Sequence, residues 1–496
     1  MQRSRWMEQF GFTVCLAVGG AIAPPTDAYA QRSNIIPDNT LGSESSRVVP
    51  LDNSGFPIDV IDQGAIRGIN LFHSFREFNV SSVRGAYFLS PNANIQNILA
   101  RVTGTNRSEI LGTLGTIGNS RPNLFLINPN GIIFGPSASL DVGGSFVATT
   151  ANSIQLGDAG LFSASEPAAS NLLSINPSAL FFNQLSRQTT IVNQARAGTP
   201  VLGFFVNPRS LPFAILPDGT FIPFPRGLQV VDGRSLALVG GDLSLDESNL
   251  TAIGGRIELG SVAGAGVVNL NPNAQGFTFG YENAGNLGNI QLSTAGVIAN
   301  GRGGGNIQIQ SARLFTTRNN FFSIISADTQ GSRNGGSIFI RTTDSVNLDN
   351  AAISTVIELG ASGNGGNITI KTPKLNINGG NSSVITRNFG TGKAGDITVD
   401  TGQLVLTNGA GILTSTLGLG NGGNLNIHAS EFVDASGTTI FNGEEIPGGL
   451  QADIRGTGVG GTLTIDTGKL ILRDGAIASA RTDDGPGGSV IIRAVG

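Results

Sequence analysis

The sequence predicts an all-β protein that winds into a long β-helix with irregular excursions. Glycine accounts for 72 of the 496 residues, yet hydrophobic residues still make up 39%, enough to bury a core and to argue against disorder. Short apolar or alternating runs, punctuated by Gly, Asn, Asp and Pro, are typical of strands and turns. The C-terminal half repeats with a period of about 30 residues, which indicates a solenoid.

Residues 1–30 have the features of a secretory signal peptide. A positive start precedes an apolar stretch from Phe10 to Ala23, which is too short to span a bilayer. Ala28 and Ala30 form an A-x-A cleavage site that would leave Gln31 as the mature N-terminus. No later segment is long and apolar enough to cross a bilayer, so we predict that the chain is not an integral membrane protein.

The charge of the chain bears on its binding partners, and its cysteine content bears on disulfide cross-links. The net charge of −4 comes with no basic run, so we predict no nucleic-acid partner. The single cysteine, Cys15, lies inside the predicted signal peptide, and the mature chain would contain none. A chain that crosses a second membrane unfolded cannot carry cross-links, but a large parallel β core also needs none, and both explanations stay open.

The repeat in the C-terminal half consists of Gly-Gly, a small polar residue, and then an apolar-polar-apolar strand. It begins at Gly304, Gly335, Gly365, Ala394, Gly422, Gly460 and Gly487. We expect about three short strands per coil, inward ladders of Ile and Val, and glycines that supply positive φ at sharp corners. The longest spacing contains residues 442–449, which we expect to form an inserted loop.

One motif lies between two apolar runs, 124–127 and 132–134. It reads Asn128-Pro129-Asn130-Gly131-Ile132. Asn at the first position, Pro fixing φ at the second and Gly at the fourth are typical of a type I turn. Taken alone, the motif predicts a tight corner between two strands.

The surroundings of this motif carry a family resemblance. The runs Asn123 to Gly135 and Leu140 to Thr150 closely resemble the N-terminal secretion domain of the filamentous haemagglutinin family, the exoproteins of two-partner secretion. Phe72 to Val80 and Ile110 to Gly115 are also similar to that family. Leu238 to Leu243 resembles a phrase of cyanobacterial members.

The resemblance has specific implications. It implies a right-handed parallel β-helix, a pectin-lyase-like solenoid, that is recognised in the periplasm of a Gram-negative type envelope. The recognising partner would be an outer-membrane β-barrel transporter with periplasmic POTRA domains, and the chain would fold at the cell surface. Asn128 to Ile132 match the family's NPNGI-type motif, which implies a turn needed for a secretion-competent domain. Whether this turn contacts the transporter stays open.

These observations divide the chain into four parts. They are a signal peptide (1–30), a two-partner secretion domain (31–155), a β-helix continuation with an irregular proline-rich excursion (156–255), and glycine-rich β-helix repeats (256–496).

We predict a secreted or surface-exposed adhesin, which acts on surface glycans or other cells and is not an enzyme. Two alternatives stay open. A β-helix enzyme acting on polysaccharide would need two or three converging carboxylates. The acidic residues of the repeats share no repeat phase: Asp328, Asp344, Asp349, Glu358, Asp396 and Asp400. The chain could also be the truncated stalk of a contact-dependent toxin, although it stops directly after a repeat strand with no C-terminal effector in view, which argues against a stalk.

No cofactor and no metal site are predicted. Two G-x-G-x-x-G matches begin at Gly418 and Gly456, but no helix follows either one, so they do not indicate a nucleotide site. His73 and His428 are the only histidines, and the mature chain lacks cysteine, which disfavours zinc ligation and nucleophilic catalysis. We expect His73, close to Phe72 and Phe75, to be a partly buried structural residue.

Overall fold

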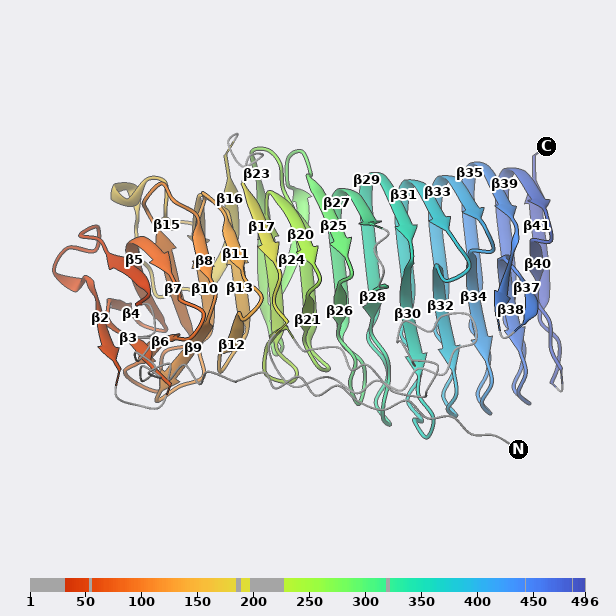
Figure 1. Cartoon of the computed structure of the whole chain (residues 1–496), viewed down its shortest axis with the longest axis horizontal. Helices are drawn as coiled ribbons and strands as arrows, with labels where there is room; N and C mark the ends of the chain where they lie inside the picture. Colours follow the sequence, from red (N-terminus) through yellow and green to blue (C-terminus); the bar gives the residue numbers. More distant parts are fainter. Residues whose placement is uncertain are drawn as a thin grey trace, which may run out of the picture.

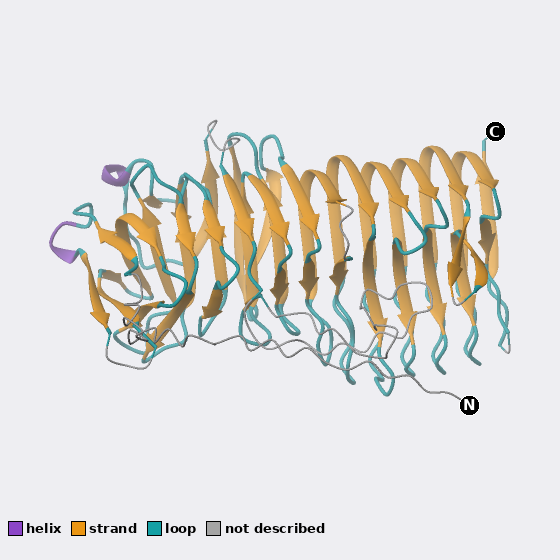
Figure 2. Ribbon diagram, in the orientation of Figure 1, coloured by secondary structure: helices purple, strands orange, loops and turns teal. Residues whose placement is uncertain are grey.

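The computed structural model describes residues 32–52, 56–183, 189–196, 227–317, 322–441, 443–483 and 485–495. The predicted signal peptide, its cleavage site and the proline-rich segment 211–225 lie outside these ranges. The described chain is a right-handed β-helix, a rod whose strands run across its long axis (Figures 1 and 2), which confirms the predicted fold class. Its helical segments are two short 3-10 turns, η1 (Gly42–Glu44) and η2 (Pro167–Ala169).

One large sheet runs the length of the rod. Its pairs are parallel, except that β1 and β4 pair antiparallel with β5. Its strands are β1 (Asn34–Pro37), β4 (Ala65–Arg67), β5 (Asn70–Asn79), β7 (Asn97–Val102), β8 (Ser108–Ile110), β10 (Asn123–Ile127), β11 (Ile132–Phe134), β13 (Phe146–Thr149), β17 (Thr190–Asn193), β19 (Ser235–Gly240), β20 (Asp242–Asp246), β22 (Arg256–Ser261), β25 (Asn289–Ser293), β27 (Asn306–Thr317), β29 (Ile338–Asp349), β31 (Ile368–Asn378), β33 (Ile397–Thr407), β35 (Leu425–Ser436), β39 (Thr462–Arg473) and β41 (Ser489–Ala494).

Two further sheets complete the walls of the rod. One wall is built from β2 (Ser46–Leu51), β3 (Ile58–Gln63), β6 (Gly85–Ser90), β9 (Thr113–Gly118) and β12 (Ser139–Asp141). The other comprises β18 (Leu228–Gln229), β21 (Asn249–Thr251), β26 (Gly296–Ile298), β28 (Ser323–Ser326), β30 (Ala351–Ile357), β32 (Ser383–Asn388), β34 (Gly411–Thr416), β38 (Gly449–Ile454) and β40 (Ile477–Ser479).

The number of strands per coil differs between the two halves. Three short strands form a coil in the first half, as β7, β8 and β9 do, which is the number expected from the sequence. From β27 onward the expectation is wrong, because the first two strands are fused into one long strand. No turn separates them; the long strand bends where its register with the next strand shifts.

Inward side chains stack as the expected aliphatic ladder. Its members in successive coils are Ile307, Ile338, Ile368, Ile397, Leu425 and Leu463, all buried. Each such side chain contributes roughly 1.5–3 kcal/mol by burial. The core is therefore continuous along the rod rather than divided between domains.

Positive φ, as expected at sharp corners, occurs at Gly304 and at glycines of another corner of the coil, such as Gly379, Gly409 and Gly475, but the second glycine of the Gly-Gly pairs has a different role. Gly336, Gly366 and Gly395 do not have positive φ. Instead, a Cβ on Gly366 would lie less than 3.0 Å from the carbonyl oxygen of Gly336, one coil earlier, and Gly395 stands in the same relation to Gly366. These glycines are needed because the backbones of successive coils touch at this corner.

The small polar residue after each Gly-Gly pair forms a ladder of hydrogen bonds along the rod. The N–H of Asn367 donates to Ser337 Oγ, that of Asp396 to Asn367 Oδ1, and that of Asn424 to Asp396 Oδ1, at 3.3, 2.9 and 2.7 Å. In each pair the earlier coil supplies the side-chain acceptor and the later coil supplies the backbone donor. The ladder satisfies backbone groups at the corner that would otherwise lack a partner.

An accessory antiparallel sheet lies against one face of the rod's first half. It consists of β14 (Ser153–Leu156), β15 (Gly160–Ser163), β16 (Pro177–Phe182), β23 (Gly266–Asn273) and β24 (Gly276–Asn283). Beneath it, the outward residues of the rod are apolar and fully buried: Phe72, Leu99, Phe125, Val147 and Ala237.

The same face changes character in the second half. Phe72, Leu99, Phe125, Val147 and Ala237 form a row at one register position, and the next residue in this row is Glu258, which is also buried. The positions after Glu258 are partly exposed. Those positions are Gln308, Phe339, Thr369, Thr398, Asn426 and Thr464. A face that is apolar and covered at one end of the rod is thus mainly polar and bare at the other.

The insertion that was expected as a loop is instead a short antiparallel hairpin. Its strands are β36 (Thr438–Phe441) and β37 (Glu444–Pro447). The hairpin is inserted between β35 and β38, and its first strand lies close to Gly380 and Gly409 of earlier coils. It lengthens one repeat while the strands on either side stay paired with their neighbours.

Candidate functional site

The motif predicted from the sequence lies at the corner between β10 and β11. The N–H of Gly131 donates to the carbonyl oxygen of Asn128 at 3.1 Å, which closes a tight turn. Gly131 has a φ of +114°, and a Cβ at this position would lie 3.0 Å from the carbonyl oxygen of Thr190. Any other residue would therefore be strained here.

Asn128 is fully buried and ties two coils together. Its Oδ1 accepts hydrogen bonds from the backbone N–H and from the side-chain amide of Asn130, at 2.9 and 3.0 Å. Its Nδ2 donates to the carbonyl oxygen of Asn106 and to Ser108 Oγ, both at 3.0 Å. Ile132 enters the core directly afterwards.

Only part of the motif faces solvent. Pro129 is half-buried and Asn130 is exposed. The amide of Asn130 is already used, because its Nδ2 also donates to the carbonyl oxygen of Gly104 at 2.8 Å. A protein that touched this corner would therefore meet the proline ring and the outer edge of the Asn130 amide.

A buried arginine connects this half of the rod to its accessory sheet. Arg101 is fully buried; its guanidinium donates to the carbonyl oxygen of Ser163 at 2.7 Å, to Ser170 Oγ at 2.6 Å and to Thr40 Oγ1 at 2.8 Å. It also lies over the ring of Phe162, 4.4 Å from the centroid. Burial lowers the pKa of Arg101 to about 10, which still leaves it charged at neutral pH.

Comparison with family models identifies this half of the molecule. Residues 33–309, more than half of the chain, match the model of the TPS secretion domain. The chain belongs to the TPS secretion domain family. The resemblance drawn from the residues around Asn128 is thereby confirmed, and the TPS domain makes the chain a secreted substrate of a two-partner system.

Comparison with solved structures shows the fold in one case. The HMW1 secretion domain from Haemophilus influenzae superposes with a TM-score of 0.50 at 17% identity, and the match covers 93% of this chain and 100% of that one. A filamentous hemagglutinin secretion domain matches with a TM-score of 0.33 at 16% identity, over 75% of this chain and 96% of that one. No curated protein matches the sequence.

The acidic residues considered for catalysis are mostly separated. Asp328 is fully buried, and burial raises its pKa well above the usual value, an effect to which nearby Glu358 adds. Three others pair with bases: Asp344 with Arg313, Asp396 with Lys393, and Asp400 with Lys371. Among the described residues, no group of three or more His, Cys, Asp or Glu side chains is placed to hold a metal ion.

Two further residues of the TPS domain were misjudged or missed. His73, expected to be partly buried, is fully buried, with its Nδ1 2.9 Å from Ser46 Oγ. Arg101 was missed because a lone arginine in a strand gives no sequence pattern from which hydrogen-bond partners 62 and 69 residues away could be predicted.

Within the described part of the chain, no helix is long and apolar enough to span a membrane.

Proposed function

We propose that this protein is exported through a partner outer-membrane β-barrel transporter with periplasmic POTRA domains and acts at the cell surface as an adhesin. The observation that carries the proposal is the match of residues 33–309 to the TPS secretion domain. In this proposal the predicted signal peptide takes the chain to the periplasm of a Gram-negative type envelope, and the transporter takes it across the outer membrane.

The adhesin role is supported by the architecture of the second half. From β27 onward the rod repeats nearly the same coil, and one face carries a regular array of polar side chains with no accessory sheet over it. A long array of repeated surface positions suits multivalent attachment to glycans or to other cells.

We also propose that Asn128 to Ile132 act mainly by forming the corner. The buried amide of Asn128 and the positive φ of Gly131 are both structural requirements, and Asn130 offers the transporter a small exposed edge. A direct contact with the transporter is the alternative role for Asn130.

A non-enzymatic role fits the carboxylates better than polysaccharide cleavage does. Glycoside hydrolysis uses two carboxyl groups that flank one bond in a site open to substrate. Asp328 is buried away from solvent, and Asp344, Asp396 and Asp400 each pair with a base. The alternative that the chain is the stalk of a toxin is independent of these carboxylates.

The export route is tested by expressing the full chain with and without its partner transporter and measuring the protein in the medium. Export should depend on the transporter, and attachment of the cells to polysaccharide-coated surfaces should depend on the chain. Equal export without the transporter would refute the two-partner route, whereas normal export without any gain in attachment would refute the adhesin role alone.

The motif is tested by comparing Asn128→Ala with Asn130→Ala for folding and export. Asn128→Ala should lower stability by about 1–3 kcal/mol, because it leaves buried hydrogen-bonding groups without partners. Asn130→Ala should have a smaller effect on both readouts. Normal folding with lost export in Asn130→Ala would instead indicate contact with the transporter.

A further inference from the structure

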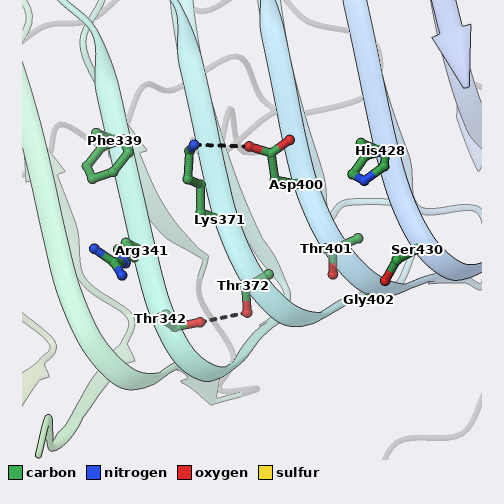
Figure 3. A pocket seen from close by; sticks show the side chains of 10 residues that line it. All are labelled: Phe339, Arg341, Thr342, Lys371, Thr372, Asp400, Thr401, Gly402, His428 and Ser430. Atoms are coloured by element: carbon green, nitrogen blue, oxygen red, sulfur yellow. Dashed lines mark hydrogen bonds and ion pairs between the residues drawn. The ribbon is translucent and has the colours of Figure 1, made fainter. Parts of the chain in front are cut away.

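The bare face of the second half contains a shallow groove of about 750 Å³. It crosses β29, β31, β33 and β35 at the place where each long strand bends (Figure 3). Four outward side chains stand in a row along it: Arg341, Lys371, Asp400 and His428. They occupy one register position in successive coils, so the row runs parallel to the axis of the rod.

The charges in this row are unequally neutralised. Lys371 Nζ lies 3.2 Å from Asp400 Oδ2, and both side chains are about half exposed. Among the described residues, no carboxylate lies within 4.0 Å of the exposed Arg341 guanidinium. With Arg341 and Lys371 adjacent and Asp400 the one carboxylate that lines the groove, this end of the row attracts anions.

The floor of the groove is held rigidly by threonines. Thr342 Oγ1 donates to Thr372 Oγ1 at 2.6 Å, and Thr372 Oγ1 donates to the carbonyl oxygen of Lys374 at 3.0 Å. Thr401 repeats this pattern one coil later by donating to the carbonyl oxygen of Gln403. Because these hydroxyls fix the bend in each coil, the groove exists before any ligand arrives, which limits the entropy lost on binding.

The chemistry of the groove favours a carbohydrate over a protein segment. Protein interfaces have an apolar, aromatic-rich centre. Here the lining is mainly charged and hydroxylic, and Phe339 at one end is the one large apolar side chain that lines it. Successive coils are spaced by about 4.8 Å, which is close to the advance per sugar in an extended polysaccharide, so consecutive sugars can meet equivalent positions.

We propose that this groove binds a linear acidic polysaccharide lying along the rod axis. A sugar carboxylate is held by Arg341 and Lys371, and hydroxyl groups of the following sugars hydrogen-bond to Asp400 and His428. Phe339 offers its ring to the apolar face of a sugar. The proposal deepens the adhesin function and rests on it, since it names the ligand class and the site.

The test is calorimetric titration of the secreted full-length protein with oligogalacturonate and with the same oligomer after methyl esterification. The acidic oligomer should bind and the neutral ester should bind at least tenfold more weakly. Arg341→Gln and Lys371→Gln should each lower the affinity about tenfold, as expected for hydrogen bonds to a charged group. Arg302→Gln, the same change at an exposed corner of the rod, should leave the affinity unchanged.

Added salt should also weaken binding, because the screening length falls from about 10 Å at 0.1 M to about 3 Å at 1 M. The proposal would be overturned if the protein did not bind the acidic oligomer, or bound it no more tightly than the methyl ester. It would also be overturned if Arg341→Gln and Arg302→Gln bound the acidic oligomer with equal affinity, or if poly-glutamate bound as tightly as the acidic oligomer. Cell attachment is measured in parallel. If wild-type cells attach and Arg341→Gln cells attach equally, the groove assignment fails while the adhesin function stands.

Discussion

Arg101 and Arg341 occupy the same register position on the rod, six coil steps apart along the chain of strand pairs. Arg101 is fully buried beneath the accessory sheet and donates to groups of two distant segments, whereas Arg341 is exposed. An arginine at this register position therefore holds segments of the protein together in the first half of the rod, whereas in the second half it is exposed to solvent and can contact a ligand.

This pair predicts opposite effects of one substitution. Arg101→Met should lower the free energy of unfolding by about 2–4 kcal/mol, because Ser163, Ser170 and Thr40 lose a buried donor. Arg341→Met should change it by no more than about 0.5 kcal/mol. Urea unfolding followed by circular dichroism measures both, and equal losses in the two variants would contradict the assigned roles.

Close backbone contact between coils predicts that the second glycine of each repeat cannot be replaced. Gly366→Ala should destabilise the rod by about 1–3 kcal/mol, because its Cβ would overlap the carbonyl of Gly336. Gly264→Ala is the matched control, since a Cβ there has its nearest neighbours at 3.5 Å and φ is not positive. If both variants unfold at the same urea concentration, the contact is not the reason for the glycine.

Burial of His73 predicts a loss of stability in acid. Burial lowers the pKa of His73 from 6.5 to about 3, with Asp62 opposing the shift. Between these two pH values the unfolded chain binds the extra proton, so stability falls as pH falls, by up to about 1.4 kcal/mol per unit. His73→Gln cannot titrate, so its stability deficit relative to wild type should shrink between about pH 6.5 and pH 5. A constant deficit over this interval would show that His73 does not control it.

Glu258 predicts the opposite pH dependence. It is fully buried beneath β24, where burial raises its pKa to about 8 while Arg256 opposes the shift. Between 4.5 and 8 the folded chain holds the extra proton, so this group lowers stability as pH rises, by up to about 1.4 kcal/mol per unit. The stability of Glu258→Gln relative to wild type should therefore increase between about pH 5 and pH 8. Parallel pH profiles for the two proteins would rule this out.

Features that depend on neighbouring residues along the chain could be predicted from the sequence. The repeat, the aliphatic ladder and the corner at Asn128 all depend on local alternation and turn chemistry, and each is present in the structure. The hairpin at 438–447 also had a local signal, the Asn-Gly pair at 442–443, which is typical of a tight hairpin turn.

Features that depend on contacts between coils escaped prediction. The reason for Gly366 lies in the carbonyl of Gly336, and the reason for Arg101 lies in Ser163 and Ser170. The groove was missed for the same cause, because Arg341, Lys371 and Asp400 become neighbours only when the coils are stacked in register. A single sequence shows the repeat period of a solenoid. It does not show which side chains of one coil lie next to which side chains of the following coil.

The accessory sheet has a consequence for the order in which the rod is completed. β16 pairs with β23 across the sheet, so the first half of the rod is not covered until residues 266–283 have been delivered. Each later coil needs only the coil before it. The first half therefore has high contact order and the second half low contact order, and a chain delivered from its N-terminus should show a lag followed by steady, rapid growth.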